Sequence, residues 1–330
     1  MLDVSRADVR LALDAVRKTA GLAQRIRAAA AVEQMTKSDL SPVTVADFAA
    51  HAVVARLLEE AFPGDVLVGE ERSDDLRTPA GKDALARVTE FVGTVLSGAT
   101  AGDVCEWIDR GASDPGGRFW VLDPVDGTKG YLRGGQYAVA FGLVEDGEVK
   151  LGVLGCPNLR GGWEADIGGS GSLIVAVRGE GAWYMPMTDE GVAKRLRVSE
   201  RSDPAEARVL RSYESAHTNT GQIDRLVGVL GVQAEPVLMD SQAKYAVMAS
   251  GEGDVLFRLL SPKQPDYREK IWDQAAGSIV VEEAGGRITD LAGKRLDFTQ
   301  GRRLENNRGV LASNGLLHDA ALAALAQVPE

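Results

Sequence analysis

The chain has 330 residues, of which 45% are hydrophobic and 26% are charged, a composition typical of a soluble globular protein. A length of this order predicts two lobes rather than one compact core. The formal net charge of −11 argues against nucleic acid or an anionic membrane as the main partner. A phosphorylated substrate stays possible on this evidence, because a bound metal ion can reverse the local field.

The cysteines and the N-terminal sequence bear on the cellular compartment. The sequence is charged from Asp3 onward, so we expect no secretory signal, and no apolar run approaches the roughly 20 residues that span a bilayer. Cys105 and Cys156 fit no Cys-x-x-Cys metal motif, and two isolated cysteines are typical of a reducing compartment. We therefore expect a cytoplasmic protein with no membrane partner.

The first elements are two helices and a short strand. Apolar residues recur at helical spacing over residues 5–33, which predicts a half-buried helix. Thr44-x-x-Asp47 has the form of a capping box, so helix capping is one interpretation of Asp47. Residues 66–71 predict a strand that ends in Glu70 and Glu71. Neighbouring side chains on a strand point to opposite faces, so we expect only one of the two to enter a shared site, and a pair of surface acids is the alternative.

A long polar insertion follows this strand. Residues 72–118 are rich in Gly and Asp and contain one predicted helix, over residues 82–96. Long insertions between strand ends are typical of lids and binding loops, so we expect one of these roles here.

The most informative stretch comes directly after the insertion. An apolar run at residues 119–122 predicts a buried strand, and we expect it to end at the Asp-Pro pair that starts with Asp123, because proline cannot donate to a sheet ladder. Gly127 permits a tight turn that gathers Asp123, Asp126 and Thr128. Two close carboxylates repel each other unless a cation lies between them, and hard oxygen ligands suit Mg²⁺. Asp-Pro and Asp-Gly are also typical of ordinary turns, so this stretch alone leaves that alternative open.

The next segments predict strands. Residues 137–153 predict a hairpin through Asp146-Gly147, a dipeptide typical of two-residue turns. Residues 173–177 and 182–185 have strand composition, and we expect them to begin the second lobe.

The second half contains a candidate anion site. We expect a helix to begin at Asp240 or Ser241, where free backbone N–H groups favour an anion, with Lys244 one turn further on. The alternative is a capped helix with an exposed lysine. Residues 255–258 predict a strand with Arg258 at its end.

Two further helices, one before and one after these segments, and a hairpin complete the predicted elements. Residues 221–231 predict a short helix, and residues 270–286 predict a helix with Asp273 in its first turn. Residues 287–298 predict a small hairpin.

Five acidic residues stand at predicted helix starts or strand ends, the positions where a scaffold presents functional groups. They are Asp47, Glu70, Asp123, Asp126 and Asp273. Around them the chain resembles the lithium-sensitive, magnesium-dependent phosphatase superfamily of inositol monophosphatase and fructose-1,6-bisphosphatase. The signatures are Gly-Glu-Glu at residues 69–71, Trp-Val-Leu-Asp-Pro-Val-Asp-Gly-Thr at residues 120–128, Trp-Asp-Gln-Ala-Ala-Gly at residues 272–277 and Glu-Ala-Gly-Gly at residues 283–286. Residues 41–47, 127–133, 240–245 and 267–273 are similar to the 3′(2′),5′-bisphosphate nucleotidases of that superfamily.

The resemblance implies a fold and a metal site. The implied fold is a layered αβαβα sandwich of mixed α/β class, with an N-terminal lobe of residues 1–157, a C-terminal lobe of residues 158–330 and the active site between them. Two to three Mg²⁺ ions are implied, with inhibition by Li⁺. The implied metal ligands are Glu70, Asp123, the Val125 carbonyl, Asp126 and Asp273, with Asp47 and Glu70 beside a third, weaker site.

The resemblance also implies a reaction, the Mg²⁺-dependent removal of the 3′-phosphate from adenosine 3′,5′-bisphosphate, with 3′-phosphoadenylyl sulfate as a second substrate. Asp47 and Thr128 would activate the attacking water. The implied substrate contacts are Gly127, Thr128, His217, Ser241, Lys244 and Arg258. The implied partner is thus a small nucleotide, and we expect a monomer. One alternative is an inositol phosphate phosphatase of the same fold, and another is an inactive, metal-binding relative.

Overall fold

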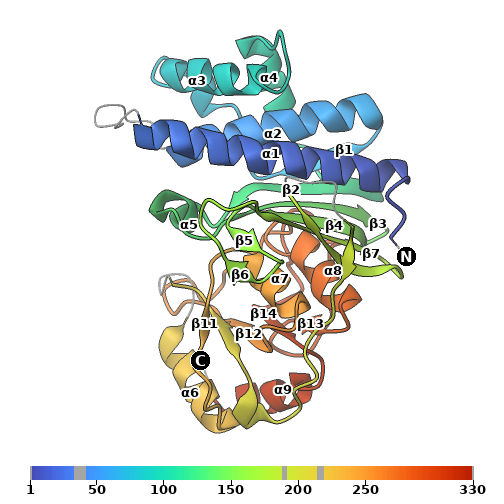
Figure 1. Cartoon of the computed structure of the whole chain (residues 1–330), viewed down its shortest axis with the longest axis vertical. Helices are drawn as coiled ribbons and strands as arrows, with labels where there is room; N and C mark the ends of the chain where they lie inside the picture. Colours follow the sequence, from blue (N-terminus) through green and yellow to red (C-terminus); the bar gives the residue numbers. More distant parts are fainter. Residues whose placement is uncertain (1, 33–41, 188–191, 214–218, 329–330) are drawn as a thin grey trace.

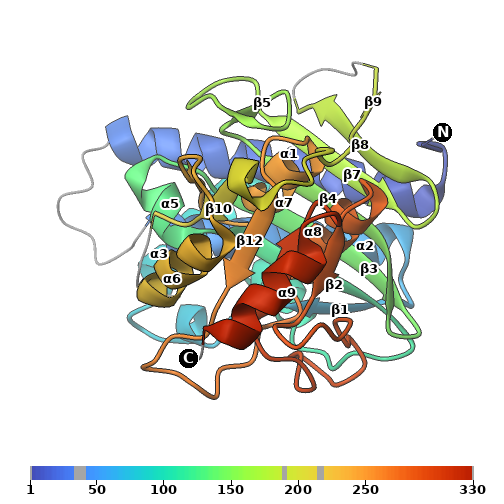
Figure 2. The same ribbon diagram turned by 90° about the horizontal axis from the view of Figure 1, so that it is seen from below.

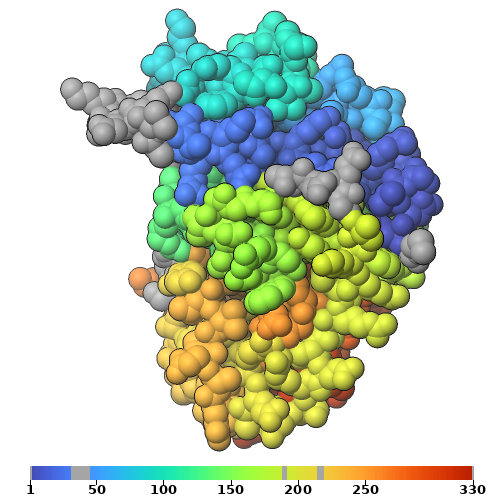
Figure 3. Space-filling model, viewed as in Figure 1, coloured from blue at the N-terminus to red at the C-terminus, as the bar shows by residue number. Residues whose placement is uncertain are grey.

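The computed structural model describes residues 2–32, 42–187, 192–213 and 219–328, with the backbone alone for residues 31, 32 and 42–44. Helices and sheets alternate along the long axis of the molecule in the order αβαβα (Figure 1). The N-terminal helices form one end, and the C-terminal half forms the other, as the change from blue to yellow and red shows (Figure 3). The predicted layered sandwich is confirmed.

Two long helices form the outer layer at the N-terminal end. Helix α1 (Ala7–Val32) and helix α2 (Pro42–Ala61) pack on each other and on one face of the first sheet. The bounds of α1 agree with the helix predicted from apolar spacing. No helix in the described part of the chain is both long enough and apolar enough to cross a bilayer.

The first sheet is mixed. In spatial order its strands are β1 (Val66–Gly69), β2 (Arg118–Asp126), β3 (Ala138–Glu145), β4 (Glu148–Cys156), β7 (Ser172–Val177), β8 (Gly181–Pro186) and β9 (Lys194–Arg195). β1 runs parallel to β2, and every later pair is antiparallel. The predicted hairpin is confirmed, with Asp146 at φ 50° and Gly147 at φ 76°, as a turn with two left-handed residues requires. Strands β5 (Leu159–Arg160) and β6 (Glu164–Ala165) form a separate small ribbon.

Both faces of this sheet are buried, because helices cover each one. Along β2, Trp120 and Leu122 belong to the core under α1 and α2, whereas Phe119 and Val121 belong to the core on the opposite face. This alternation follows from the two-residue period of a strand. A strand buried on both faces reads as a continuous apolar run, as residues 119–122 do.

The C-terminal half supplies the remaining layers. Helices α7 (Ala243–Ala249) and α8 (Ala275–Glu283) lie between the sheets. The second sheet has the order β11 (Val237–Leu238), β10 (Val209–Arg211), β12 (Val255–Arg258), β14 (Val310–Ser313) and β13 (Arg287–Thr289). Helices α6 (Thr220–Leu230) and α9 (His318–Gln327) cover its outer face, as the view from below shows (Figure 2). The helix predicted over residues 221–231 and the strand predicted over residues 255–258 are confirmed.

The insertion holds more structure than predicted. It contains a 3₁₀ turn (Asp75–Arg77), α3 (Lys82–Gly93) and a helix that the prediction missed, α4 (Ala101–Asp109). Thr100 and Asp103 form a complete capping box at the start of α4. Both helices pack on α2, so these residues extend the helical layer.

Three expectations about the later elements were wrong. Strands β7 and β8 do not begin a second lobe, because β7 is hydrogen-bonded to β4 and extends the first sheet past the expected boundary at residues 157 and 158. The hairpin over residues 287–298 does not form, because β13 pairs with β14 instead. The helix over residues 270–286 starts only at Ala275, since residues 271–274 form turns.

Candidate active site

A cleft of about 360 Å³ brings most of the predicted site residues together. Its walls come from the ends of β1, β2 and β12, the start of α5 (Thr128–Arg133), and the segments just before α7 and α8. The lining residues are Glu70, Asp123, Val125, Asp126, Gly127, Thr128, Lys129, Gly130, Ser212, Asp240, Ser241, Lys244, Arg258 and Asp273. Asp47 does not line it but lies beside it, and His217 lies outside the described residues.

The end of β2 carries the central carboxylates. The strand does not stop at Asp123 as expected, because it continues through Pro124 to Asp126. Asp123 is opposite Ala140 and Asp126 is opposite Ala138, so β2 contains one extra residue at this point. Such a bulge accommodates a proline without a donor and changes the direction of the neighbouring side chains.

The candidate ligand carboxylates in the cleft repel one another; Asp123 is buried, Asp126 and Asp273 are half-buried, and Glu70 is exposed. Asp123 is 2% exposed, and its Oδ1 has no hydrogen-bond partner among the described residues. Burial, and then the charges of Glu70, Asp126 and Asp273, raise the pKa of Asp123 well above its usual value. Burial also raises the pKa of Asp126, although Lys244 opposes the effect. Buried carboxylates of this kind are costly unless a cation compensates them.

Both acids after β1 act on the same neighbour. Desolvation by surrounding protein atoms, and then nearby carboxylates, raise the pKa of Glu70 and of Glu71 to about 7, although Glu70 is exposed and Glu71 half-buried. Burial raises the pKa of Asp47, and among the charges Glu71 contributes more than Glu70. Of the pair, Glu70 lines the cleft and Glu71 does not, in agreement with the expectation that one of the two enters the shared site. Glu71 instead acts on Asp47 through its charge and does not line the cleft.

Asp47 also differs from its expected setting. The helix is already formed at Pro42, so Asp47 lies in its second turn and not at the third position of a capping box that starts at Thr44. Its side chain is 9% exposed on the same helix as the core residues Ala46 and Phe48. A carboxylate in a helix interior, next to two other acids, is a candidate for chemistry rather than for capping.

Asp273 stands just before α8, two residues ahead of the first helical position. It accepts a hydrogen bond from Arg258 Nη2 at 3.2 Å, and Arg258 Nε also pairs with Glu269 at 2.6 Å. Burial raises the pKa of Asp273 despite this partner. Arg258 therefore joins β12 to the segment that carries Asp273.

The opposite wall of the cleft contains a lysine, and two backbone segments come very close together there. Lys244 is 7% exposed, which rejects the exposed-lysine interpretation, and its Nζ lies 3.1 Å from Ser212 Oγ. Burial lowers the pKa of Lys244 to about 8. Ser241 has φ +64°, so α7 begins at Ala243 and not at residue 240 or 241 as expected. Gly127 has φ +89°, and a Cβ there would lie 2.8 Å from the Cβ of Ser241. The close approach of these two segments therefore needs glycine at position 127.

The donor set fits divalent metal ions. All the candidate ligands are hard oxygen donors, and the unpartnered Asp123 Oδ1 is the kind of buried atom that a cation would satisfy. Among the described residues, no three His, Cys, Asp or Glu side chains already converge on a single point. The carboxylates instead share one cleft, which suits an ion that also binds water and substrate phosphate.

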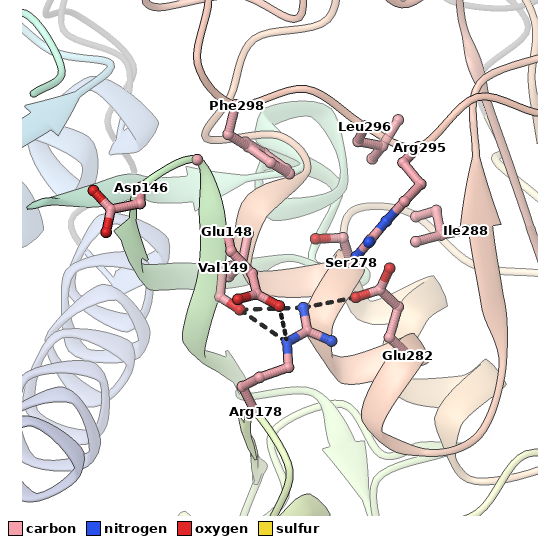
Figure 4. Close-up of a pocket in the computed structure, with 11 residues that line it drawn as sticks. Asp146, Glu148, Val149, Arg178, Ser278, Glu282, Ile288, Arg295, Leu296 and Phe298 are labelled. Carbon is pink, nitrogen blue, oxygen red and sulfur yellow. Dashed lines mark hydrogen bonds and ion pairs between the residues drawn. The ribbon is translucent and has the colours of Figure 1, made fainter. Parts of the chain in front are cut away.

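A second pocket lies at the turn between β3 and β4, next to α8 (Figure 4). Its Arg178 pairs with Glu282 at 2.7 Å and with Glu148 at 3.4 Å, and it donates to the Val149 carbonyl. These contacts join the first sheet to the middle helix layer. Since its guanidinium is already bound by carboxylates, we assign this pocket a structural role.

Comparison with known proteins agrees with this geometry. The sequence model of the inositol monophosphatase family matches residues 3–330. The chain is 42% identical over 299 residues to 3′(2′),5′-bisphosphate nucleotidase 1 of Arabidopsis thaliana, covering 82% of this chain and 83% of that protein. It is 39% identical over 341 residues to the 3′(2′),5′-bisphosphate nucleotidase of Emericella nidulans, covering 95% and 96%. Among solved structures it is similar to the IMPase of Thermotoga maritima, with a TM-score of 0.63 and 20% identity over 98% of each chain. The chain therefore belongs to the inositol monophosphatase family.

Proposed function

We propose that this chain is a metal-dependent phosphomonoesterase that hydrolyses the 3′-phosphate of adenosine 3′,5′-bisphosphate to AMP and inorganic phosphate. The observation that carries the proposal is a single cleft with clustered carboxylates, among them the buried Asp123, on one wall and a buried lysine on the other. Carboxylates suit divalent cations, and the lysine suits a second phosphate on the same substrate. The relatives named as bisphosphate nucleotidases support this substrate.

The inositol monophosphatase family is generally metal-dependent, and we infer that the metal here is Mg²⁺, two to three ions per site. The residues that would hold it are Glu70, Asp123, the Val125 carbonyl, Asp126 and Asp273, with Asp47 and Glu70 beside a weaker position. When bound, Mg²⁺ neutralises phosphate charge and lowers the pKa of coordinated water. We expect Li⁺ to inhibit by occupying one of these positions.

The chain's own residues would orient the attacking water and accept its proton during cleavage of the phosphate ester. Asp47 and Thr128 would orient the attacking water, and Asp47 would accept its proton. Burial and the charges of Glu71 and Glu70 raise the pKa of Asp47 in the metal-free site, so the bound cations would be needed to keep its carboxylate ionised and able to accept that proton. The water oxygen forms the new bond to phosphorus, the bond to the 3′-oxygen breaks, and that oxygen takes up a proton as the hydroxyl of AMP.

The 5′-phosphate would bind on the lysine wall. Lys244 is the main cation for it, with Arg258 behind it, and Ser241 and Gly127 provide the close backbone approach. Arg258 is already engaged by Asp273 and Glu269, so its contribution to phosphate binding would be smaller than that of Lys244. His217 completes the proposed nucleotide contacts.

Other substrates would use the cleft differently. An inositol phosphate has no 5′-phosphate to contact the buried Lys244, whereas 3′-phosphoadenylyl sulfate keeps a 5′-phosphate group and would be a second substrate of the same cleft. We expect an inactive relative to lack at least one of the five acidic residues or Thr128, yet all six are present. We further propose that the chain acts as a monomer in the cytoplasm.

The test is the identity of the product. With Mg²⁺, purified protein should convert adenosine 3′,5′-bisphosphate to AMP, detected by chromatography against both monophosphate standards. Formation of adenosine 3′-monophosphate would reverse the assignment of the two phosphate sites. Absence of either product, with Mg²⁺ binding retained, would favour the inactive relative.

A further inference from the structure

One arginine joins the two segments that carry metal ligands from opposite halves of the chain. Arg302 donates through Nη2 to the carbonyl of Gly69, and through Nη1 to the carbonyls of Gly111 at 3.1 Å and Ser113 at 2.9 Å. Gly69 immediately precedes the candidate ligand Glu70. Three carbonyls from two chain segments are thus held by one guanidinium.

The loop that carries Arg302 is fixed to the segment before α8. The Ile271 N–H donates to the Arg302 carbonyl at 3.3 Å, and the Leu304 N–H donates to the Glu269 carbonyl at 2.9 Å. The Arg302 guanidinium lies 5.1 Å from the ring centroid of Trp272, which is 5% exposed. Trp272 directly precedes Asp273, the candidate ligand from the C-terminal half. A guanidinium over an indole ring is a favourable contact that also fixes both planes.

A buried histidine packs against the two glycines whose carbonyls bind Arg302. His51 is fully buried and lies one helical turn after Asp47 on α2. A Cβ on Gly69 would lie 2.3 Å from the His51 ring, and a Cβ on Gly111 would lie 2.2 Å from it. The Gly69 N–H also donates to the Gly111 carbonyl at 2.9 Å. These two glycines are therefore packed against the imidazole, while their carbonyls bind Arg302.

We propose that Arg302 is a positioning residue that sets the spacing between Glu70 and Asp273 for divalent metal binding. The inference rests on the metal site of the proposed function. Within the described part of the chain, the three acceptors of Arg302 hydrogen bonds are backbone carbonyls, so its contribution is to geometry. A lysine has no planar fork and cannot hold three carbonyls while stacking on a ring, so the role needs arginine.

The test compares Arg302→Met and Arg302→Lys with the control Arg303→Met. Arg303 is the next residue and is exposed, and its backbone bridge to Lys270 does not depend on its side chain. Mg²⁺ affinity is measured by calorimetry and by the Mg²⁺-induced rise in melting temperature, neither of which needs turnover. The half-saturating Mg²⁺ concentration for turnover and the KM at saturating Mg²⁺ complete the set.

We expect Arg302→Met to weaken Mg²⁺ binding by about tenfold or more, as removal of an outer-shell support does in other metal sites. The KM for the bisphosphate at saturating Mg²⁺ should change little, and Arg303→Met should behave as wild type. Arg302→Lys should also bind Mg²⁺ more weakly, and it provides the comparison if Arg302→Met does not fold.

A lower melting temperature with unchanged Mg²⁺ affinity would assign Arg302 a structural role and overturn the proposal. A rise in KM with unchanged Mg²⁺ dependence would overturn it as well. Failure of the proposed function would appear separately, as wild-type protein that binds Mg²⁺ but forms no AMP.

Discussion

Lys244 provides a direct way to separate the nucleotide site from the metal site. Replacing it with alanine removes a nearly fully buried ammonium whose Nζ lies 3.1 Å from Ser212 Oγ and whose charge acts on Asp126. In the proposed complex this ammonium contacts the 5′-phosphate and not the phosphate that is hydrolysed. The loss should therefore appear mainly in the binding of substrates that carry a 5′-phosphate.

The size of the effect follows from the burial of the contact. A hydrogen bond to a charged group contributes about 2 kcal/mol. This corresponds to a roughly 30-fold increase in KM, because each 1.4 kcal/mol is a factor of ten. The lysine is shielded from water, so screening by salt should reduce the effect only slightly.

The assay compares two substrates that differ by one group, adenosine 3′,5′-bisphosphate and adenosine 3′-monophosphate. Lys244→Ala should raise the KM of the first and leave that of the second nearly unchanged. Lys263→Ala provides the matched control, since Lys263 is exposed and away from the cleft. Equal losses on both substrates would refute the assignment and make Lys244 a support of the metal site through Asp126.

Two further predictions concern the acids. Asp126→Asn keeps the volume and removes a ligand charge, so turnover should fall by a factor on the order of 10³ while circular dichroism stays native; near-normal activity would remove Asp126 from the ligand set. The pKa values of Glu70 and Glu71 rise to about 7 in the folded protein, so their stabilising contribution is present below about pH 4.5 and is lost as the pH rises through about 7. In EDTA the melting temperature should accordingly be lower at pH 8 than at pH 5.5, and Mg²⁺ should raise it more at pH 8; a metal effect that is the same at both pH values would contradict this.

Local chemistry made part of the fold predictable. The apolar spacing of α1 and the Asp146-Gly147 turn each depend on residues that are close in sequence, and both predictions were confirmed. The missed helix α4 had such a signal too, because Thr100 and Asp103 form a capping box that could have been recognised. The sheet of β7 could not be predicted, since strand composition does not identify the partner strand.

The candidate site was predictable to the same extent, because only patterns among residues close in sequence can be recognised. The motif around Asp123 and Asp126 correctly indicated a shared cleft, because its residues are adjacent in the chain. The prediction that only one of the two adjacent acids would enter the cleft also agrees with the structure, since Glu70 lines the cleft and Glu71 does not. The contacts of Arg302 join residues more than 180 positions apart, and no local pattern records them.

The most direct test of the central claim is phosphate release with Mg²⁺ from adenosine 3′,5′-bisphosphate beside inositol 1-phosphate, with and without millimolar Li⁺. The account predicts strong preference for the nucleotide and loss of that activity with lithium. Preference for the inositol ester would contradict the account. The assignment of the carboxylates as metal ligands would be kept, but the roles proposed for Ser241, Lys244 and Arg258 would be wrong.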